Sequence, residues 1–395
     1  MKKGFICIAI IINFVFYGCI TRGESAITEQ LSYEPASEII EIQSFDGYTL
    51  KGRLTLPGTE TIDKLVIFVN SSGPHTYDTR RDFGAGVENH NDFYASRFQS
   101  QGIAFFAYNT RGIDLGDTPP LFFTMDDEKY ETYLPSTSVE DIYYMINYIR
   151  ASDLRLNNSR VLLLGHSEGA IIAPLVAEKY PGLIDGLFLA GIPVDNLRDV
   201  LIWQNTGGSS MAWYRGHFEA DNLGRINREA FQADPNNLLL NILQGVVFEQ
   251  IDLNNDGFIS EEDFAIMLPY VVGYTLEEVL SAIERRNDNW LKANYGGGFI
   301  PLTSGWFLEH FELNSNMELL PKLDLPIFIF HGTLDQNCDV GKVYALKDRL
   351  AELNRTNVTI NIFAGHDHEL NIEQYIISNT MPEGMQALFD AIYNF

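Results

Sequence analysis

The stretch Val161–Gly169, with the sequence VLLLGHSEG, decides the fold of this chain. Its apolar half precedes a G-x-S-x-G turn, and the small and apolar segment Ala170–Ala177 follows. This order is typical of a buried strand that enters a sharp turn and continues as a helix. Such a turn strains the backbone of its serine, here Ser167, and its glycines allow the helix to pass close to the strand. We therefore predict an exposed, reactive hydroxyl at the carboxyl end of a strand.

Apolar strands and helical patterns alternate on both sides of this stretch. Two alternating runs around Asp46-Gly47 predict a β-hairpin at the start of the folded region. The later strands are predicted at Leu65–Val69, Ile103–Tyr108, Arg160–Leu164, Leu183–Ala190, Leu325–Phe330 and Val358–Phe363, and helices at 91–100, 138–150, 340–353 and from Pro382. This alternation predicts an α/β fold, with a mainly parallel sheet covered by helices on both faces.

The alternation of strands and helices is interrupted between residues 195 and 320. This segment has helical patterns and many aromatic residues. We interpret it as an insertion into a single sheet domain, which then comprises residues 38–194 and 321–395. Its aromatic side chains are expected to form the walls of a pocket, although core packing is the more common fate of any one of them.

The N-terminus has the pattern of an export signal. Lys2-Lys3 precede the apolar run Phe5–Phe16, which is too short for a comfortable membrane span. Gly18-Cys19 resembles the cleavage site of a bacterial lipoprotein, with ordinary cleavage nearby or an uncleaved anchor as alternatives. We expect a leader at 1–19, a tether at 20–37, and a location in the bacterial periplasm or at the cell surface, with a lipid on Cys19.

Charge and cysteine content narrow the classes of partner. The formal charge of −26 argues against nucleic acid and anionic membrane surfaces as partners. Of three cysteines, only Cys338 lies outside the leader, so a mature chain has no second body cysteine to pair with it. We interpret Cys338 as a structural residue.

A serine nucleophile needs a base, and the base needs an acid that fixes its tautomer. The loops after the strands at 325–330 and 358–363 supply both, and parallel strands bring their carboxyl ends to one edge. Asp335 is preferred to Asp339 because it is nearer to its strand, and His366 is preferred to His368 because it follows the strand's glycine. The predicted triad is therefore Ser167, Asp335 and His366.

The same chemistry needs two N–H donors for an oxyanion. One is the backbone amide of Glu168, directly after the nucleophile. The other is expected in the loop after the strand at 65–69, with Ser72 as first choice and Ser71 as second. Asn70 is expected to brace this loop with its side chain.

These motifs resemble the α/β-hydrolase superfamily, and most of all serine esterases with a Gly-Ser-Gly-Pro loop and an Asn-Thr-Arg-Gly loop. The corresponding residues are Ser71–Pro74 and Asn109–Gly112, together with the elbow Gly165–Gly169. Asn70-Ser71 stand where many members have His-Gly. The resemblance implies ester hydrolysis through an acyl-enzyme and a helical lid after the sixth strand, which is where the insertion at 195–320 falls.

The insertion contains a segment, 252–263, that closely resembles an EF-hand calcium loop. Gly257 stands at the sharp turn, and Asp263 holds the twelfth position, where Glu is usual and where dockerin loops also carry Asp. The expected ligands are Asp252, Asn254, Asp256, the carbonyl of Phe258, Ser260 through water, and Asp263. No second loop is visible in the sequence, so we expect one weak, structural Ca²⁺ in the lid.

Taken together, the sequence predicts an exported serine hydrolase that acts on a small-molecule carboxylic ester and needs no organic cofactor. One alternative is an exopeptidase or amidase, which uses the same triad on the same fold. The other is a catalytically silent, calcium-dependent binding module at the cell surface.

Overall fold

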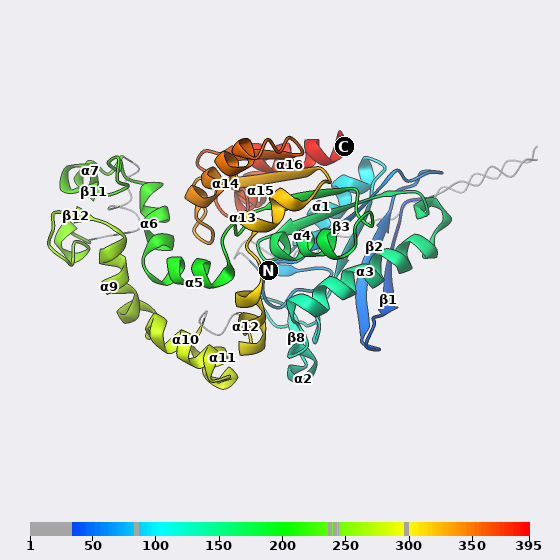
Figure 1. The fold of residues 1–395 in the computed structure, drawn as a ribbon, viewed down its shortest axis with the longest axis horizontal. Helices are drawn as coiled ribbons and strands as arrows, with labels where there is room; N and C mark the ends of the chain where they lie inside the picture. The colour runs from blue at the N-terminus through cyan, green and yellow to red at the C-terminus, as the bar shows by residue number, and fades with distance from the viewer. Residues whose placement is uncertain (1–33, 83–86, 236–238, 240–242, 244, 296–299) are drawn as a thin grey trace, which may run out of the picture. The chain divides into compact units, whose positions relative to one another are not determined.

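A computed structural model describes residues 34–82, 87–235, 239, 243, 245–295 and 300–395. The predicted leader and most of the tether lie outside these residues. The centre of the fold is an eight-stranded sheet (Figure 1). Its strands, in the order in which they lie side by side, are β1 (Ala36–Gln43), β2 (Thr49–Leu56), β6 (Ala104–Tyr108), β3 (Lys64–Val69), β9 (Arg160–His166), β10 (Gly186–Ala190), β13 (Ile327–Gly332) and β14 (Val358–Phe363).

The strand directions confirm the predicted α/β class. β1 and β2 form the antiparallel hairpin around Asp46-Gly47, β2 also pairs antiparallel with β6, and the strands from β6 to β14 run parallel. Val69 of β3 lies beside Gly165 of β9, and Ala190 of β10 lies beside His166. The carboxyl ends of β3, β9 and β10 therefore meet at one edge, where loops from each can share a site.

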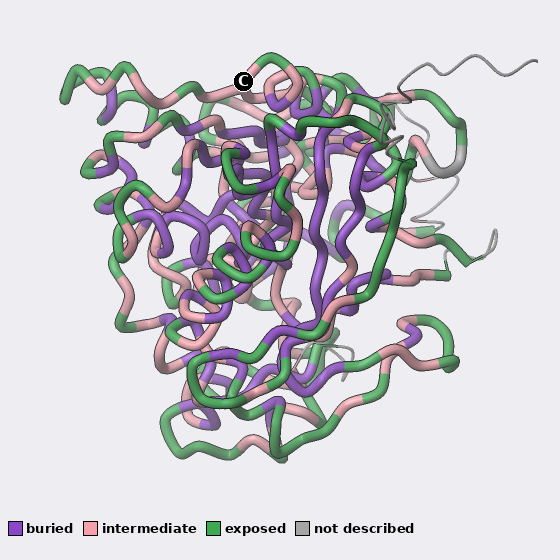
Figure 2. Tube along the Cα trace, turned by 90° about the vertical axis from the view of Figure 1, so that its right-hand side faces the viewer, coloured by how far each residue is buried: buried purple, intermediate pink, exposed green. Residues whose placement is uncertain are grey.

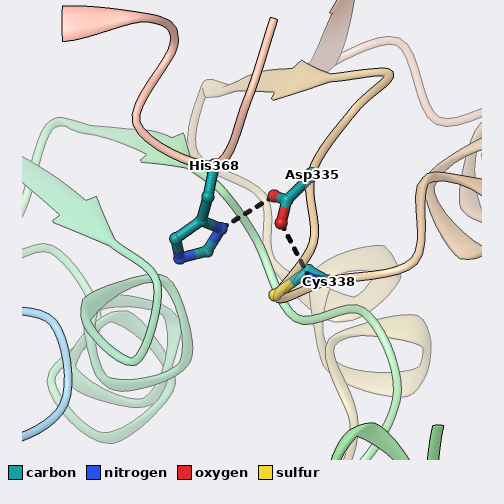
Figure 3. A group of neighbouring side chains, drawn as sticks. All are labelled: Asp335, Cys338 and His368. Atoms are coloured by element: carbon teal, nitrogen blue, oxygen red, sulfur yellow. Dashed lines mark hydrogen bonds and ion pairs between the residues drawn. The ribbon is translucent and has the colours of Figure 1, made fainter. Parts of the chain in front are cut away.

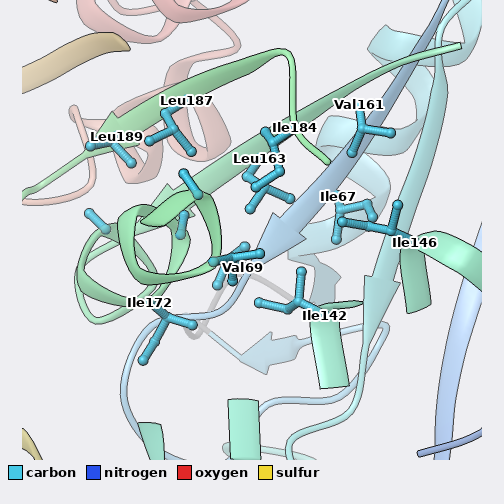
Figure 4. Packing of buried hydrophobic residues seen from close by; sticks show 14 of the residues in the cluster. Ile67, Val69, Ile142, Ile146, Val161, Leu163, Ile172, Ile184, Leu187 and Leu189 are labelled. Atoms are coloured by element: carbon cyan, nitrogen blue, oxygen red, sulfur yellow. The ribbon is translucent and has the colours of Figure 1, made fainter. Parts of the chain in front are cut away.

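Helices cover both faces of the sheet because its buried strands are apolar on both sides. One face packs against α3 (Pro135–Ser152), α4 (Gly169–Lys179) and α14 (Val340–Glu352), and Figure 4 shows part of this cluster. The other face packs against α1 (His90–Ser100), α15 (Ile372–Ser378) and α16 (Glu383–Tyr393). Figure 2 shows that buried residues concentrate on the strands while exposed residues lie on the outer segments. The sheet thus forms a rigid frame beneath the site.

Short elements complete this frame. The segment after β3 carries a small antiparallel pair, and the segment between β6 and α3 carries another. These elements are β4 (Arg80–Asp82), β5 (Val87–Asn89), β7 (Ile113–Leu115), β8 (Phe123–Met125), α2 (Asp127–Tyr130) and the 3₁₀ turn η1 (Leu154–Leu156).

The segment between β10 and β13 adds helices rather than sheet strands. β10 is the sixth strand of the main sheet in chain order, so this segment occupies the position expected for a lid. Its elements are α5 (Leu197–Asn205), α6 (Gly208–Arg215), β11 (Ile226–Asn227), α7 (Arg228–Ala233), η2 (Phe248–Gln250), β12 (Phe258–Ile259), α9 (Glu261–Val272), α10 (Leu276–Glu284), α11 (Asp288–Asn294), α12 (Ser304–Glu312), α13 (Asn316–Leu319) and η4 (Leu320–Lys322).

Two apolar clusters hold the insertion together. One joins α10, α11 and α12 to Tyr130 and Tyr133 of the sheet domain. The other lies around Ile226 and Ile259, in the distal part of the insertion. Within the described residues no single helix is long and apolar enough to cross a bilayer, although α9 and α10, bent by 65°, pass that test as a pair.

Candidate active site

Ser167 lies on a strained turn between β9 and α4. Its φ of 55° is in the left-handed region, which costs a residue with a side chain about 1–3 kcal/mol. A Cβ on Gly165 would lie 2.3 Å from the carbonyl oxygen of Gly169, and a Cβ on Gly169 would lie 2.0 Å from that of Val69. Both glycines are therefore required for the close approach of helix and strands. This geometry directs the Ser167 hydroxyl away from the strand end.

The structure corrects the predicted base. His368, not His366, contacts Asp335, with 2.8 Å between Nδ1 and Oδ2 (Figure 3). His366 uses both ring nitrogens elsewhere: Nδ1 donates to the carbonyl of Ala364 and Nε2 accepts from the amide of Gly384, each at 3.1 Å. The choice of His366 as the catalytic base was therefore wrong.

The reason lies in the turn after β14. The carbonyl of His366 accepts from the amide of Leu334 at 2.9 Å, so the chain at 366 is still bound to the loop after β13. Two further residues are needed before a side chain reaches over Asp335. The position of a histidine relative to Gly365 in the sequence could not reveal the course of this turn.

Asp335 is held as a buried carboxylate at the end of β13. Its Oδ1 accepts from the amides of Asn337 and Cys338, at 2.8 and 2.9 Å. Burial alone would raise the pKa of Asp335, but the charge and hydrogen bond of His368 outweigh it and hold the pKa at about 2. Asp339 instead accepts from the amide of Gly341 at the start of α14, and so has a capping role.

His368 has the orientation that a general base requires. Because Nδ1 carries the proton donated to Asp335, Nε2 is left with a free electron pair. Burial lowers the pKa of His368, yet the charge of Asp335 and its hydrogen bond dominate and raise it above the usual value. The ring of His166 lies 4.8 Å from that of His368, and its Nε2 donates to the His368 carbonyl at 3.1 Å. The residue before the nucleophile thus braces the base.

Asp335, Cys338 and His368 also have ligand atoms within 4.8 Å of one another (Figure 3). Burial raises the pKa of the Cys338 thiol well above its usual value, so the sulfur stays protonated, and it is directed at the carbonyl of Gly191 at 3.5 Å. A metal would need the thiolate and would compete for the His368 nitrogen already bonded to Asp335. We interpret this group as part of a hydrolytic site and Cys338 as a packing residue.

The predicted oxyanion loop is fixed by β6 and the loop after it. Nδ2 of Asn70 donates to the carbonyl of Tyr108 at 3.0 Å. The hydroxyl of Thr110 donates to the carbonyl of Gly73, also at 3.0 Å. Ser71 and Ser72 line the same cavity as Ser167 and His368. The Asn109–Gly112 loop therefore has a scaffold role, which its buried Arg111 reinforces through a bidentate bond to Asp141.

The cavity at this edge has a volume of about 770 Å³ and joins the sheet domain to the insertion. Its floor contains Ser167, Glu168 and His368. Its walls are largely apolar and come from α5, α9 and α12 of the insertion: Leu197, Val200, Leu201, Leu268, Val272, Trp306 and Phe307. A cavity with these walls is suited to hold an apolar group next to the serine.

The predicted calcium loop forms a compact turn between η2 and α9. Gly257 has a φ of 88°, as the sharp turn requires, and Asp263 is fully buried. Oδ1 of Asp263 accepts from the amides of Leu253 and Asn254, at 2.8 and 3.1 Å. Among the described residues, no Lys or Arg nitrogen forms an ion pair with Asp252, Asp256 or Asp263. The carboxylates of Asp252 and Asp263 accept hydrogen bonds from backbone amides. A buried carboxylate without a cationic partner fits a bound cation.

The structure also reveals a second loop, residues 219–230, that the sequence did not disclose. β11 pairs with β12, and Ile226 lies opposite Ile259. Phe218, Ile226 and Phe231 have the same spacing as Ile251, Ile259 and Phe264, and all six are buried in one cluster. Gly224 and Gly257 precede the paired isoleucines at the same distance and both have positive φ. This repeated spacing is the signal that could have identified the pair.

The second loop has a cationic side chain of its own, Arg225. Both Nε and Nη2 of Arg225 donate to Oδ2 of Asp221, at 3.1 and 2.8 Å. The guanidinium also lies 3.8 Å from the centre of the Phe258 ring, in the first loop. Arg225 therefore neutralises Asp221 and links the two loops.

Comparisons with known proteins agree with this fold. The family model described as serine aminopeptidase S33 matches residues 86–218. A highly thermostable carboxyl esterase from Bacillus coagulans has a TM-score of 0.52 at 16% identity, over 91% of this chain and 98% of that one. An acylaminoacyl peptidase from Pyrococcus horikoshii has a TM-score of 0.47 at 12% identity, over 93% of this chain but 41% of that one. No curated protein sequence matches the chain significantly.

The chain therefore has the α/β-hydrolase fold. At the carboxyl edge of its sheet it carries the serine, imidazole and carboxylate that serine hydrolases of this fold use. At these identities the likeness bears on the fold alone.

Proposed function

We propose that the chain is an exported serine hydrolase that cleaves carboxylic esters through an acyl-enzyme. The observation that carries the proposal is the strained serine of the elbow in one cavity with an imidazole hydrogen-bonded to a buried aspartate. In this mechanism Nε2 of His368 accepts the Ser167 proton while Oγ attacks the acyl carbon. The oxyanion is held by the amide of Glu168 and by an amide of the Ser71–Gly73 loop.

The intermediate then collapses and the carbon–oxygen bond to the alcohol breaks. The alcohol leaves with the proton from His368, and the acyl group remains on Ser167. Water repeats the sequence with the same proton transfers and releases the acid. Asp335 stays ionised throughout, since its role is to orient His368 and to stabilise its cation.

An aminopeptidase or amidase is the second candidate, supported by the name of the matched family model. A free α-amine is bound most strongly by a carboxylate, so an aminopeptidase is expected to place one near the serine. The two acidic residues that line the cavity are already bonded: Glu168 to Tyr133 and Trp306, and Glu369 to Arg81. This favours an ester with an apolar acyl or alcohol group over an aminoacyl amide.

The deciding experiment uses a fluorophosphonate probe and two substrate series. We expect the probe to label Ser167 in the wild type and not in S167A, and short acyl nitrophenyl esters to be cleaved faster than aminoacyl nitroanilides. Absence of labelling would support the silent binding module, and the reverse order of rates would support the peptidase.

We infer that the insertion binds one structural Ca²⁺. Asp252, Asn254, Asp256 and Asp263 would hold it, with the carbonyl of Phe258 and with Ser260 through water. The ion would neutralise carboxylates that pair with no basic side chain in the described part of the chain. Its chemistry there is structural, since the loop lies in the distal cluster of the insertion.

Export and lipidation of Cys19 complete the proposal. They are supported by the basic start, the short apolar run and Gly18-Cys19. Incorporation of a radiolabelled fatty acid into the full chain, and not into C19A, is the expected result. Equal incorporation into both would contradict the anchor.

A further inference from the structure

Glu168, the residue after the nucleophile, has a buried carboxylate that contacts two distant parts of the chain. It is 2% exposed. Its Oε1 accepts from the indole N–H of Trp306, on α12 of the insertion, at 2.9 Å. Its Oε2 accepts from the hydroxyl of Tyr133, just before α3. One side chain thus joins the elbow, the sheet domain and the lid.

These donors offset the cost of burying the Glu168 carboxylate. An ionised carboxylate loses several kcal/mol of hydration on burial unless hydrogen bonds replace it. Burial and the nearby charge of Glu168 raise the pKa of Tyr133 well above its usual value, so the phenol remains a donor. Nε2 of His310 lies 3.3 Å from Oε1 but outside hydrogen-bond geometry. Tyr133 and Trp306 are therefore the two groups that fix the carboxylate.

The same contacts lie next to both halves of the predicted oxyanion hole. The backbone amide of Glu168 is one half. Tyr133 and Glu168 line a small cavity together with Asn70, which begins the loop that supplies the other half. The Glu168 half is thus tied to α12 through Trp306, and the Glu168–Tyr133 pair lies beside the loop of the other half.

We propose that Glu168 is a positioning residue, whose carboxylate sets the geometry of the oxyanion hole and couples that geometry to the docking of α12. This inference rests on the proposed hydrolase. A transition state gains from preorganised donors, and small errors in their position cost rate rather than substrate affinity. The effect of Glu168 is therefore expected in the chemical step.

The test uses a fluorophosphonate probe, because its reaction with Ser167 needs the same base and the same oxyanion donors. We expect E168Q to lower the maximal inactivation rate by about 10- to 100-fold, with half-saturation changed by less than about threefold. The acid limb of the rate–pH profile should stay in place, since His368 and Asp335 are intact. A general distortion of the site would move that limb and weaken probe binding, and would contradict the proposal.

Glu309 offers a matched control. It lies on the same helix, α12, and its Oε1 accepts from the amide of Ser136 at 2.5 Å, so it also links α12 to the start of α3. It does not contact the elbow. E309Q should react with the probe like the wild type. Equal rates for E168Q and E309Q would show that Glu168 has no role beyond attachment of the lid.

Two further variants keep the test decisive. Y133F and W306F each remove one donor and should lower the rate less than E168Q, and the double variant E168Q/W306F should be no slower than E168Q. If E168Q does not fold, these two carry the test, and wild-type rates in both would contradict the proposal. A wild type that never reacts with the probe contradicts the hydrolase itself, which separates the two failures.

Discussion

The sheet domain and the insertion build the site in different ways. In the sheet domain, strand register fixes Ser167, Asp335 and His368, because β9, β13 and β14 end at one edge. In the insertion, the wall residues sit on short helices held by two separate apolar clusters and a few polar contacts. The proposed chemistry therefore depends mainly on topology, whereas selectivity depends on packing, and the contact between Trp306 and Glu168 couples the two.

The largest effect is expected from replacing the catalytic base in the sheet domain. H368A should reduce ester hydrolysis by roughly 10⁴- to 10⁶-fold, since it removes the proton acceptor of Ser167. H366A should keep activity within about tenfold but lose about 1–3 kcal/mol of unfolding free energy, because the Gly384 amide loses its partner. Steady-state rates and urea unfolding of both variants measure this. A large loss in H366A alone would restore the original assignment.

The pH dependence tests the same edge of the sheet. His368 must be neutral to accept a proton, so the rate should fall about tenfold per pH unit below the pKa of His368. Asp335 raises that pKa, and D335N should therefore move the acid limb to lower pH while the plateau falls by about 10³- to 10⁴-fold. Rate–pH profiles of wild type and D335N would show it. A limb that moves to higher pH, or stays in place, would mean that Asp335 does not control His368.

Removal of calcium tests the insertion without touching the sheet. Ca²⁺ at about 100 times its dissociation constant raises the free energy of unfolding by about 2.7 kcal/mol. A chelator should therefore lower the Tm of the chain by a few degrees. Titration calorimetry should give one ion per chain, because Arg225 already neutralises the second loop. D263N should bind none, and R225A should still bind one. An unchanged Tm, or two ions in the wild type, would contradict this view of the paired loops.

The smallest expected effect concerns selectivity. Leu268 lines the cavity from α9, and L268A should shift the preference among acyl chain lengths by about three- to tenfold, with little change for the shortest esters. I266A, on the exposed face of the same helix, is the control and should leave the preference unchanged. A competition assay over acyl lengths measures both. Equal shifts would mean that α9 acts through stability and not as a wall.

The residues that the sequence predicted well are those fixed by short-range patterns. The elbow, the strands and the hairpin follow from apolar runs and glycines, and Asp335 follows from its place after β13. His368 did not follow, because two residues of turn geometry separate it from His366. The partner of the calcium loop was missed because Leu223 and Ala230 stand where the first loop has Asp256 and Asp263, while the apolar spacing remained. Glu168 was assigned only through its amide, since long-range partners such as Trp306 cannot be read from a local motif.

The close approach at Gly165 and Gly169 has a practical consequence for engineering. Any added carbon at either position meets backbone atoms at 2.0–2.3 Å, so libraries that vary the elbow will consist mostly of unfolded proteins. The cavity-facing residues of α5 and α9, such as Val200 and Leu268, should tolerate change better, whereas Trp306 of α12 binds Glu168. A search for new substrates should leave the turn and Trp306 unchanged and vary the residues of the other two walls.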